Sequence, residues 1–327
     1  MDINEIARRA GVSRATISRY LNDGYVSKEK RDRIRQIIEE TGYVPSQHAR
    51  QLRTGKTHLV GVIMPKINSQ SVSRMVAGIT DPLASEGYQV ILASTANDEH
   101  AEVDYLRLFA EHNRVDGIIL IGTVLSAEHR EVINDLRIPF VILGQHTPGI
   151  PCVYHDDYHA MFEIAKLVLG KSRRPAYLGV FERDIAAGKE RHRGFVDACA
   201  EMGIDLDPQS QLVVDFDSDS GYFGAEKILD TIPDVDTIVC ATDDIAFGAL
   251  MCMREYGKRV PEDVQVTGVG DSLLSQIMRP SLTTVHLFYK TSGVRAAQML
   301  LAKIDGSEDG AQEIKMPYEV YGRMSMR

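Results

Sequence analysis

The chain has 327 residues, which is too long for one ordinary domain and long enough for two or three. With 44% hydrophobic and 25% charged residues it can bury sizeable cores, so the composition excludes a disordered chain. No apolar run reaches the roughly 18 residues of a membrane span. The N-terminal stretch MDINEIARRAG also lacks the apolar segment of a secretory signal. These features predict a cytoplasmic protein without a membrane partner.

The four cysteines are scattered along the chain and form no CxxC pair and no zinc-like spacing with histidine. We therefore expect reduced, mostly buried thiols and no metal site, in agreement with the cytoplasm. The cysteines are Cys152, Cys199, Cys240 and Cys252.

The net charge of −9 is unevenly distributed. Residues 1–58, called the head below, contain twelve Lys or Arg and seven Asp or Glu, a net charge of +5. The remaining residues, called the body, carry −14. A small basic head on an acidic body indicates that the head contacts phosphate and the body does not.

Residues 1–44 predict a unit of short helices. Asp2 followed by Glu5 is an acidic variant of a capping box, and it predicts a first helix over residues 3–10. Gly11 supplies the tight turn that follows this helix.

A second helix is predicted from Arg14 to about Leu21, with Ser13 as its cap. A third helix begins after Ser27 and ends at Gly42. Apolar residues at i, i+4 spacing let the three helices share one small core. The first two helices, joined through Ala-Gly-Val-Ser, fit an all-α helix-turn-helix headpiece.

The exposed face of the second helix has the side chains that a reader of the major groove needs. Arg14 can offer a bidentate fork to guanine, and Ala15 is small enough to lie beside a thymine methyl group. The neighbouring polar residues are suited to backbone phosphates. A solvated polar face is the alternative interpretation. The candidate DNA-binding residues here are Ser13, Arg14, Ala15, Thr16, Ser18, Arg19 and Asn22.

Residues 45–58 predict a hinge helix and a linker. Pro45 is well placed to begin a helix and Gly55 to end one. So short a helix is marginal in water and should need a partner or DNA to form. Its apolar face contains only Ala49 and Leu52, and two such segments from a dimer can push leucines into a minor-groove step and kink the duplex.

Residues 59–327 alternate apolar runs with amphipathic stretches, which predicts two doubly wound α/β lobes with parallel sheets. The predicted buried strands form two series of four, LVGVIM, YQVILAS, DGIILIG and PFVILG, then PAYLGVF, QLVVDF, DTIVCAT and VQVTGV. The predicted helices cover residues 72–86, 99–113, 126–136, 157–170, 189–202, 219–230 and 244–256.

Ligands of doubly wound folds bind outside the carboxyl ends of the strands. The residues that follow the predicted strands are rich in hydroxyls, amides, carboxylates and arginine, with one aromatic ring. These groups suit a polyhydroxylated ring, although loops at strand ends are polar in any case. The candidate effector-binding residues are Ser69, Ser71, Thr123, Gln145, Arg191, Phe216, Asp243 and Asp271.

No catalytic motif accompanies these residues. The sequence has no GxSxG elbow, no HExxH helix, no P-loop and no complete dinucleotide fingerprint. The adjacent carboxylates Asp156–Asp157 and Asp243–Asp244 are interpreted as helix caps. We therefore expect a protein that is not an enzyme and has no cofactor.

Residues 2–57 resemble the headpiece of the LacI/GalR family of repressors, because the A-G-V-S turn, the T-x-S-R helix and the hinge occur together. The resemblance implies that Arg14 and Ala15 read bases. Ser46 stands where the family often has Asn, and it can still cap the hinge helix. By the same resemblance, the DNA backbone is contacted by Thr16, Ser18 and Arg19. The leucine that intercalates between base pairs is Leu52.

The body is similar to the family's periplasmic-binding-protein-type sensor, with local matches such as VDGIIL, RHRGF and PSLTTVH. The resemblance implies that Arg191 and Phe216 contact the effector, and that Asp271 or Gly270 takes the position of the effector-binding aspartate. Thr242 stands where sugar-sensing members often have Asn. The strings PKINSQSVSR and VYHDDY are similar to repressors of sucrose or α-glucoside operons.

The resemblance implies a homodimeric repressor that binds a pseudo-palindromic operator in double-stranded DNA and leaves it when a sugar or phosphosugar closes the body. A difference of roughly 5 kcal/mol in affinity for the two lobe arrangements would switch occupancy. Three alternatives stay open, namely a purine- or nucleoside-responsive regulator, a catabolite regulator that docks a phosphorylated carrier protein, and a sugar-binding protein of an uptake system.

These assignments predict that the two activities separate by mutation. Leu52→Ala should weaken operator binding severely and leave sugar affinity nearly unchanged, because only the hinge is altered. Arg191→Ala should instead give a repressor that no longer responds to the sugar. Operator and sugar titrations of both variants test this, and equal effects on both activities would contradict it.

Overall fold

The computed structural model describes residues 2–21, 24–43, 56–111, 114–308 and 310–327. The chain forms two compact units, Met1–Thr57 and His58–Arg327, and each unit has its own hydrophobic core. The whole of the predicted hinge helix, from Pro45 to Gly55, lies outside the described residues. The same holds for the candidate DNA-binding residues Asn22, Ser46, Ala49 and Leu52.

The head is a three-helix unit, as the sequence predicts. Asp2 accepts a hydrogen bond from the backbone N–H of Glu5 at 2.8 Å. Ser13 accepts one from the N–H of Thr16 at 3.2 Å, and Gly11 ends the first helix with φ +62°. The core is formed chiefly by Ile6, Ala10, Ile17 and Ile34. The helices are α1 Ile3–Ala10, α2 Arg14–Tyr20 and α3 Lys28–Thr41.

The body contains two six-stranded sheets, not two sets of four strands. Lobe 1 has the strand order β11-β5-β4-β3-β1-β2, and its pairs are all parallel. Its elements are β1 Leu59–Met64, α5 Gln70–Ser85, β2 Gln89–Ser94, α6 Glu99–Ala110, β3 Gly117–Ile121, α7 Ala127–Asp135, β4 Phe140–Leu143, β5 Cys152–His155, α13 Tyr289–Ile304 and β11 Glu313–Met316.

Lobe 2 has the strand order β12-β10-β9-β8-β6-β7, in which β12 alone is antiparallel to its neighbour. Its elements are α8 Asp157–Leu169, β6 Pro175–Gly179, a π-helix Ile185–Glu190, α9 Arg191–Glu201, a 3₁₀ turn Pro208–Ser210, β7 Gln211–Val213, α10 Ser218–Thr231, β8 Thr237–Cys240, α11 Asp243–Glu255, β9 Gln265–Val269, α12 Leu273–Ile277, β10 Thr283–Leu287 and β12 Tyr318–Tyr321. None of the helices described is long and apolar enough to span a membrane.

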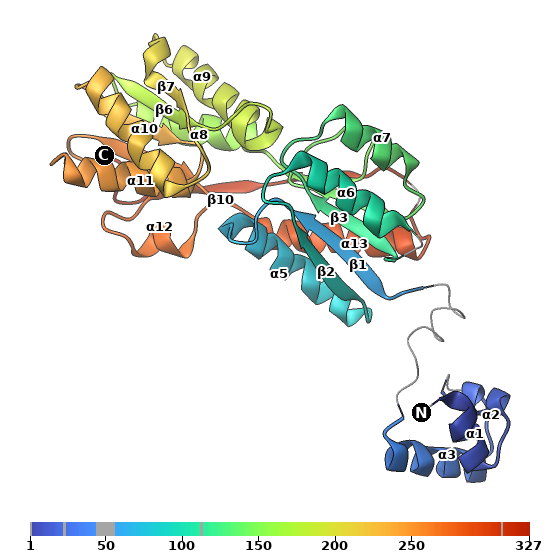
Figure 1. The fold of residues 1–327 in the computed structure, drawn as a ribbon. Helices are drawn as coiled ribbons and strands as arrows, with labels where there is room; N and C mark the ends of the chain where they lie inside the picture. The colour runs from blue at the N-terminus through green and yellow to red at the C-terminus, as the bar shows by residue number, and fades with distance from the viewer. Residues whose placement is uncertain (1, 22–23, 44–55, 112–113, 309) are drawn as a thin grey trace. The chain divides into compact units, whose positions relative to one another are not determined.

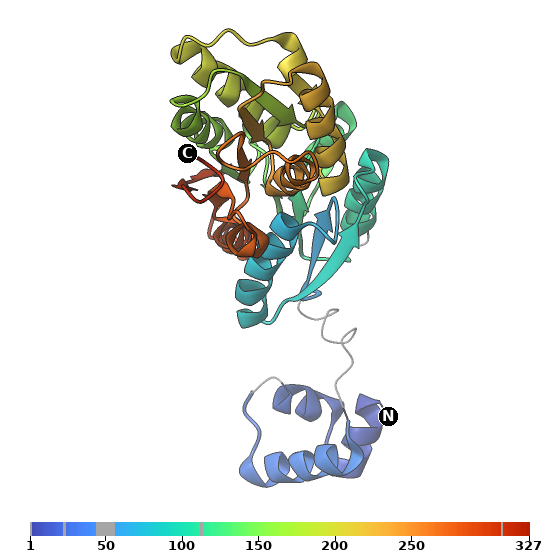
Figure 2. The same ribbon diagram turned by 90° about the vertical axis from the view of Figure 1, so that its left-hand side faces the viewer.

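The chain passes between the lobes three times, after β5, after β10 and after β11. After the second passage, α13 returns to lobe 1 and packs against α5, and the two helices lie side by side in both views (Figures 1 and 2). The strands next to the passages are the four that the sequence prediction missed. They contain His, Thr, Tyr and Glu and form no continuous apolar run.

The prediction for strand β2 is correct in its position and wrong in its burial. The strand forms where expected, but it lies at the edge of the lobe 1 sheet and is mostly exposed. Ile91 and Leu92 are 38% and 45% exposed. The apolar run QVILAS therefore indicated a strand correctly and full burial incorrectly.

Glycines set the close approach of α5 and α13. A Cβ at Gly78 would lie 1.9 Å from the carbonyl oxygen of Lys290, and one at Gly293 would lie 2.1 Å from that of Met75. Backbone atoms cannot yield as a flexible side chain can, so the two helices would have to separate.

Gly78→Ala is therefore expected to lower the free energy of unfolding of the body by about 1–3 kcal/mol. The matched control is Gly170→Ala, because Gly170 has φ −56° and a Cβ there meets nothing within 4 Å. The control should be neutral or stabilising by up to about 1 kcal/mol. Urea denaturation followed by circular dichroism measures both, and a Gly78→Ala variant as stable as the wild type would contradict this packing.

Candidate functional site

The exposed face of α2 offers two arginines without acidic partners. Arg14, Ala15 and Arg19 are exposed, whereas Thr16 and Ser18 are half-buried. Within the described ranges, no carboxylate pairs with Arg14 or Arg19. Their guanidinium groups are therefore available to an external anion or base edge.

The arginines of α1 differ from those of α2. Arg8 and Arg9 pair with Glu5 at 2.7 and 3.0 Å, and these bonds lower the pKa of Glu5 to about 2. Glu5 thus turns toward the arginines, and only the Asp2 half of the predicted capping box is formed. The exposed face of α2 therefore carries positive charge that can meet DNA phosphates, as a DNA-reading helix requires.

The body contains a cavity of about 560 Å³ whose walls come from both lobes. Its size is that of an ordinary small-molecule site. Asp271 does not line it; its carboxylate pairs with Arg323 and with His286, the latter at 2.8 Å, while Gly270 and Ser272 face the cavity. The other predicted effector-binding residues all line it, namely Ser69, Ser71, Thr123, Gln145, Arg191, Phe216 and Asp243.

Arg191 is held rigidly in the wall of lobe 2. It is 5% exposed and donates from Nε and Nη2 to the Asp157 carboxylate at 2.8 and 2.7 Å. Its Nη1 donates to the carbonyl of Ala241 at 2.6 Å. The π-helix Ile185–Glu190 directly precedes Arg191 and sets its position. The remaining N–H groups of the guanidinium can reach a ligand.

Asp184 joins the two lobes across the cavity. Gln145 of lobe 1 donates to its carboxylate at 2.8 Å, and the N–H of Ala187 donates at 3.0 Å. The amide oxygen of Gln145 accepts in turn from the N–H of Ala186. Burial raises the pKa of Asp184 to about 6, and the bond from Gln145 opposes this rise.

Asp243 is a second buried carboxylate of the cavity wall. It accepts hydrogen bonds from the Thr284 hydroxyl and, at 3.1 Å, from the N–H of Ser272. A Cβ at Gly268 would lie 2.6 Å from its Oδ1, so a glycine there makes room for the carboxylate. Burial raises the pKa of Asp243 to about 6.

The helix-cap interpretation of the paired aspartates is wrong. Asp156 makes no side-chain cap bond and pairs with His159 at 2.8 Å, Asp157 holds Arg191, and Asp243 bonds Ser272 and Thr284. The hydroxyl of Thr242 caps α11 instead. These pairings join residues far apart in the sequence, so spacing alone could not reveal them.

The cavity wall also contains residues that were not predicted. Arg74 on α5 donates to the carbonyls of Gly270 and Asp271 in lobe 2 and lies over the Tyr289 ring at 4.8 Å. The rule for strand ends does not cover a residue inside a helix such as Arg74, and it missed His155 because β5 was not predicted. The unpredicted residues include Arg74, His155, Asp157 and Tyr289.

A two-lobed body around a polar cavity, with a basic helix-turn-helix head, defines a ligand-responsive DNA-binding regulator as a class. A family model described as "Bacterial regulatory proteins, lacI family" matches residues 2–46. A second, described as "Periplasmic binding proteins and sugar binding domain of LacI family", matches residues 57–324.

Known proteins are similar over nearly the whole chain. The HTH-type transcriptional regulator RegA of Clostridium saccharobutylicum is 32% identical, over 99% of this chain and 98% of RegA. The sucrose operon repressor of Staphylococcus xylosus is 31% identical, over 91% of this chain and 92% of the repressor. A solved complex of the transcriptional regulator CelR with cellobiose is 26% identical, covers 99% of both chains and has a TM-score of 0.76.

The chain belongs to the LacI family of bacterial regulatory proteins. It is a transcriptional regulator and not an enzyme. Both the helix-turn-helix head and the two-lobed α/β body predicted from the sequence are confirmed.

The raised pKa of Asp243 has a measurable consequence for stability. An aspartate in an unfolded chain has a pKa of about 3.9. Between about pH 4 and pH 6 the folded chain therefore holds a proton at Asp243 that the unfolded chain has released. The free energy of unfolding must fall as the pH rises through this range.

Asp243→Asn removes this titration, so its stability relative to the wild type should grow from pH 4 to pH 7 by up to about 3 kcal/mol. Asp217→Asn is the control of opposite sign, because a bond from the N–H of Ser220 lowers the pKa of Asp217. Its stability relative to the wild type should stay nearly level from pH 4 to pH 7 and should fall with rising pH only below about pH 4, where Asp217 titrates. Denaturation at several pH values tests both, and parallel curves for Asp243→Asn and the wild type would rule out a buried, proton-holding Asp243.

Proposed function

We propose that this regulator is a homodimeric repressor of carbohydrate-utilisation genes that a neutral sugar releases from its operator. Residues 1–44 bind DNA, residues 45–58 form the hinge and residues 59–327 bind the sugar and the second protomer. The observation that carries the proposal is the cavity of about 560 Å³ shared by both lobes, with aspartates and arginines in its wall. The four buried free cysteines support a location in the cytoplasm, where thiols stay reduced.

The charges of the cavity wall favour a neutral sugar over a phosphosugar. Five aspartates line the cavity, against two arginines and one lysine. Arg191 is neutralised by Asp157, while Asp184 and Asp243 have no cationic partner in the described part of the chain. A phosphate would meet this excess of negative charge, whereas sugar hydroxyls donate to carboxylates without such a cost. Phe216, near Phe181 at 5.6 Å, supplies the apolar face.

Sugar binding is coupled to the arrangement of the lobes through polar contacts between them. Gln145 bonds Asp184, Arg74 bonds the carbonyl of Gly270 at 2.6 Å, and Arg183 of lobe 2 pairs with Glu99 of lobe 1 at 2.8 Å. A sugar that binds one arrangement of these contacts more tightly shifts the population toward it. In the proposed mechanism, this shift changes the spacing of the two hinge segments in the dimer.

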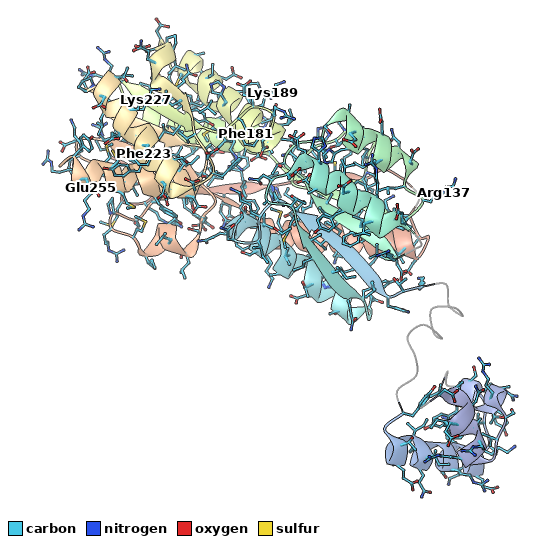
Figure 3. The ribbon with its side chains drawn as sticks, in the orientation of Figure 1. Arg137, Phe181, Lys189, Phe223, Lys227 and Glu255 are labelled. Atoms are coloured by element: carbon cyan, nitrogen blue, oxygen red, sulfur yellow. The ribbon has the colours of Figure 1, made fainter. Side chains whose placement is uncertain are left out.

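Exposed apolar side chains supply the surface for the second protomer. Phe223 on α10 is 63% exposed and carries a label in Figure 3. Met251 on α11 and Leu273 on α12 are 52% and 68% exposed, and Ile91 on the edge strand of lobe 1 is 38% exposed. A second protomer that covers such side chains would remove their apolar surface from water, which favours association.

The proposal predicts operator release by neutral sugars. A duplex selected from random DNA should bind the protein tightly, and sucrose, cellobiose or another neutral mono- or disaccharide should release it. Phosphosugars and purines serve as the competing classes. Fluorescence anisotropy of the labelled duplex gives the answer, and release by a phosphosugar or a purine alone would contradict the proposed effector class.

Substitutions in the head should separate the sequence specificity of DNA binding from the general affinity for DNA. Arg14→Ala should weaken the free energy of binding to the selected duplex by about 1–3 kcal/mol, because a base contact is lost. Binding to random DNA should change little. Arg19→Ala should weaken binding to all duplexes and reduce the salt dependence by about one phosphate contact. Arg8→Ala is the control, since Glu5 already pairs with Arg8. Titrations at several salt concentrations measure all three, and identical behaviour of Arg14→Ala and Arg19→Ala would refute this division.

A further inference from the structure

His155 is buried beside the cavity, and none of the described residues is its hydrogen-bond partner. It is the last residue of β5, where the chain first leaves lobe 1, and its side chain is 6% exposed. In the ranges that the structure describes, neither ring nitrogen bonds another residue, and Nε2 is fully covered. Buried polar groups of proteins nearly always have a partner, and an exception calls for an explanation.

The His155 ring lies where a bound ligand can be its hydrogen-bond partner. The ring lines the cavity of about 560 Å³ and also an adjoining cavity of about 290 Å³. Tyr289, from the second passage between the lobes, meets it edge-on at 5.0 Å. The imidazole thus stands in the wall where the two passages meet the ligand space.

The chemistry of the ring suits a hydroxyl group. Burial lowers the pKa of His155 to about 4, the nearby Asp157 opposes this, and Arg191 and Arg74 add to it. With Tyr289 these are the ionisable groups that face it. The ring is therefore neutral at pH 7, with one nitrogen that donates and one that accepts. A sugar hydroxyl also both donates and accepts, whereas a phosphate oxygen only accepts.

We propose that His155 is a specificity-determining residue that hydrogen-bonds a hydroxyl group of the bound sugar. The contact sits at a passage between the lobes, so the sugar that satisfies it is held by the part of the chain that joins them. This inference rests on the proposed function and extends it by one named contact. It assigns a role to a strand-end residue that the sequence analysis did not reach, because β5 itself was not predicted.

The test compares two buried polar groups that both lack a partner. His155→Leu removes the polar ring atoms and should raise the dissociation constant of the released sugar at least about tenfold. Operator affinity without sugar should not change. Tyr177→Phe is the matched control, because the Tyr177 hydroxyl is buried, has no partner among the described residues and lines neither cavity. The control should keep the sugar affinity of the wild type.

Calorimetric titrations with sucrose and cellobiose, or with whichever neutral sugar releases the wild type, give the constants. Equal affinities of His155→Leu and the wild type would overturn the role of His155 and leave the proposed function standing. Equal weakening by Tyr177→Phe would show a general loosening of the body and would overturn it too. A wild type that binds no neutral sugar would instead contradict the proposed function.

His155→Gln keeps a donor and an acceptor and serves if the leucine variant does not fold. Its amide places these atoms differently from the ring, so the preference between two bound sugars should change. Melting temperatures of all variants identify losses that come from folding alone. An unchanged preference in a folded His155→Gln would also overturn the inference.

Discussion

The ion pair between Arg191 and Asp157 is the interaction on which the binding wall depends. Both side chains are about 95% buried, and a buried pair of this kind adds little net stability, because desolvation consumes most of the attraction. Its value is positional. Asp157 and the Ala241 carbonyl fix the guanidinium before any ligand arrives, so a sugar does not have to order a long side chain. Gly188 permits this arrangement, since a Cβ there would lie 2.1 Å from the Phe181 carbonyl oxygen.

The three passages of the chain between the lobes turn this rigid wall into a sensor. Each lobe keeps its own sheet, so the lobes can change their arrangement by bending at the passages without disturbing either core. The buried carboxylates Asp184 and Asp243 are costly in the free protein, as their raised pKa values show. Buried carboxylates with raised pKa values are typical of functional sites, where a lower free energy of unfolding accompanies a group that binds the ligand.

The sequence predicted those parts of the fold that are recorded in local patterns. Continuous apolar runs such as LVGVIM indicated the central parallel strands, and the Asp2 and Ser13 caps indicated the helices of the head. The passages were missed because β5 and β10 contain His and Thr and have no apolar run. In the site, the rule for strand ends found Gln145 and Asp243, but the roles of Asp157 and Arg74 depend on residues 34 or more positions away. Asp271 followed a strand as expected and yet faces Arg323, since pairing partners are not visible in a one-dimensional pattern.

The central claim is that the occupancy of the sugar cavity and that of the operator control each other. Coupling between two binding sites is reciprocal, so the factor by which sugar weakens operator binding must equal the factor by which operator weakens sugar binding. The direct measurement is the dissociation constant of the releasing sugar, by calorimetry, for the free protein and for the protein saturated with operator duplex. The account predicts weaker sugar binding in the complex, by the same factor as the loss of operator affinity. The same sugar constant in both states, with the operator still bound, would contradict it.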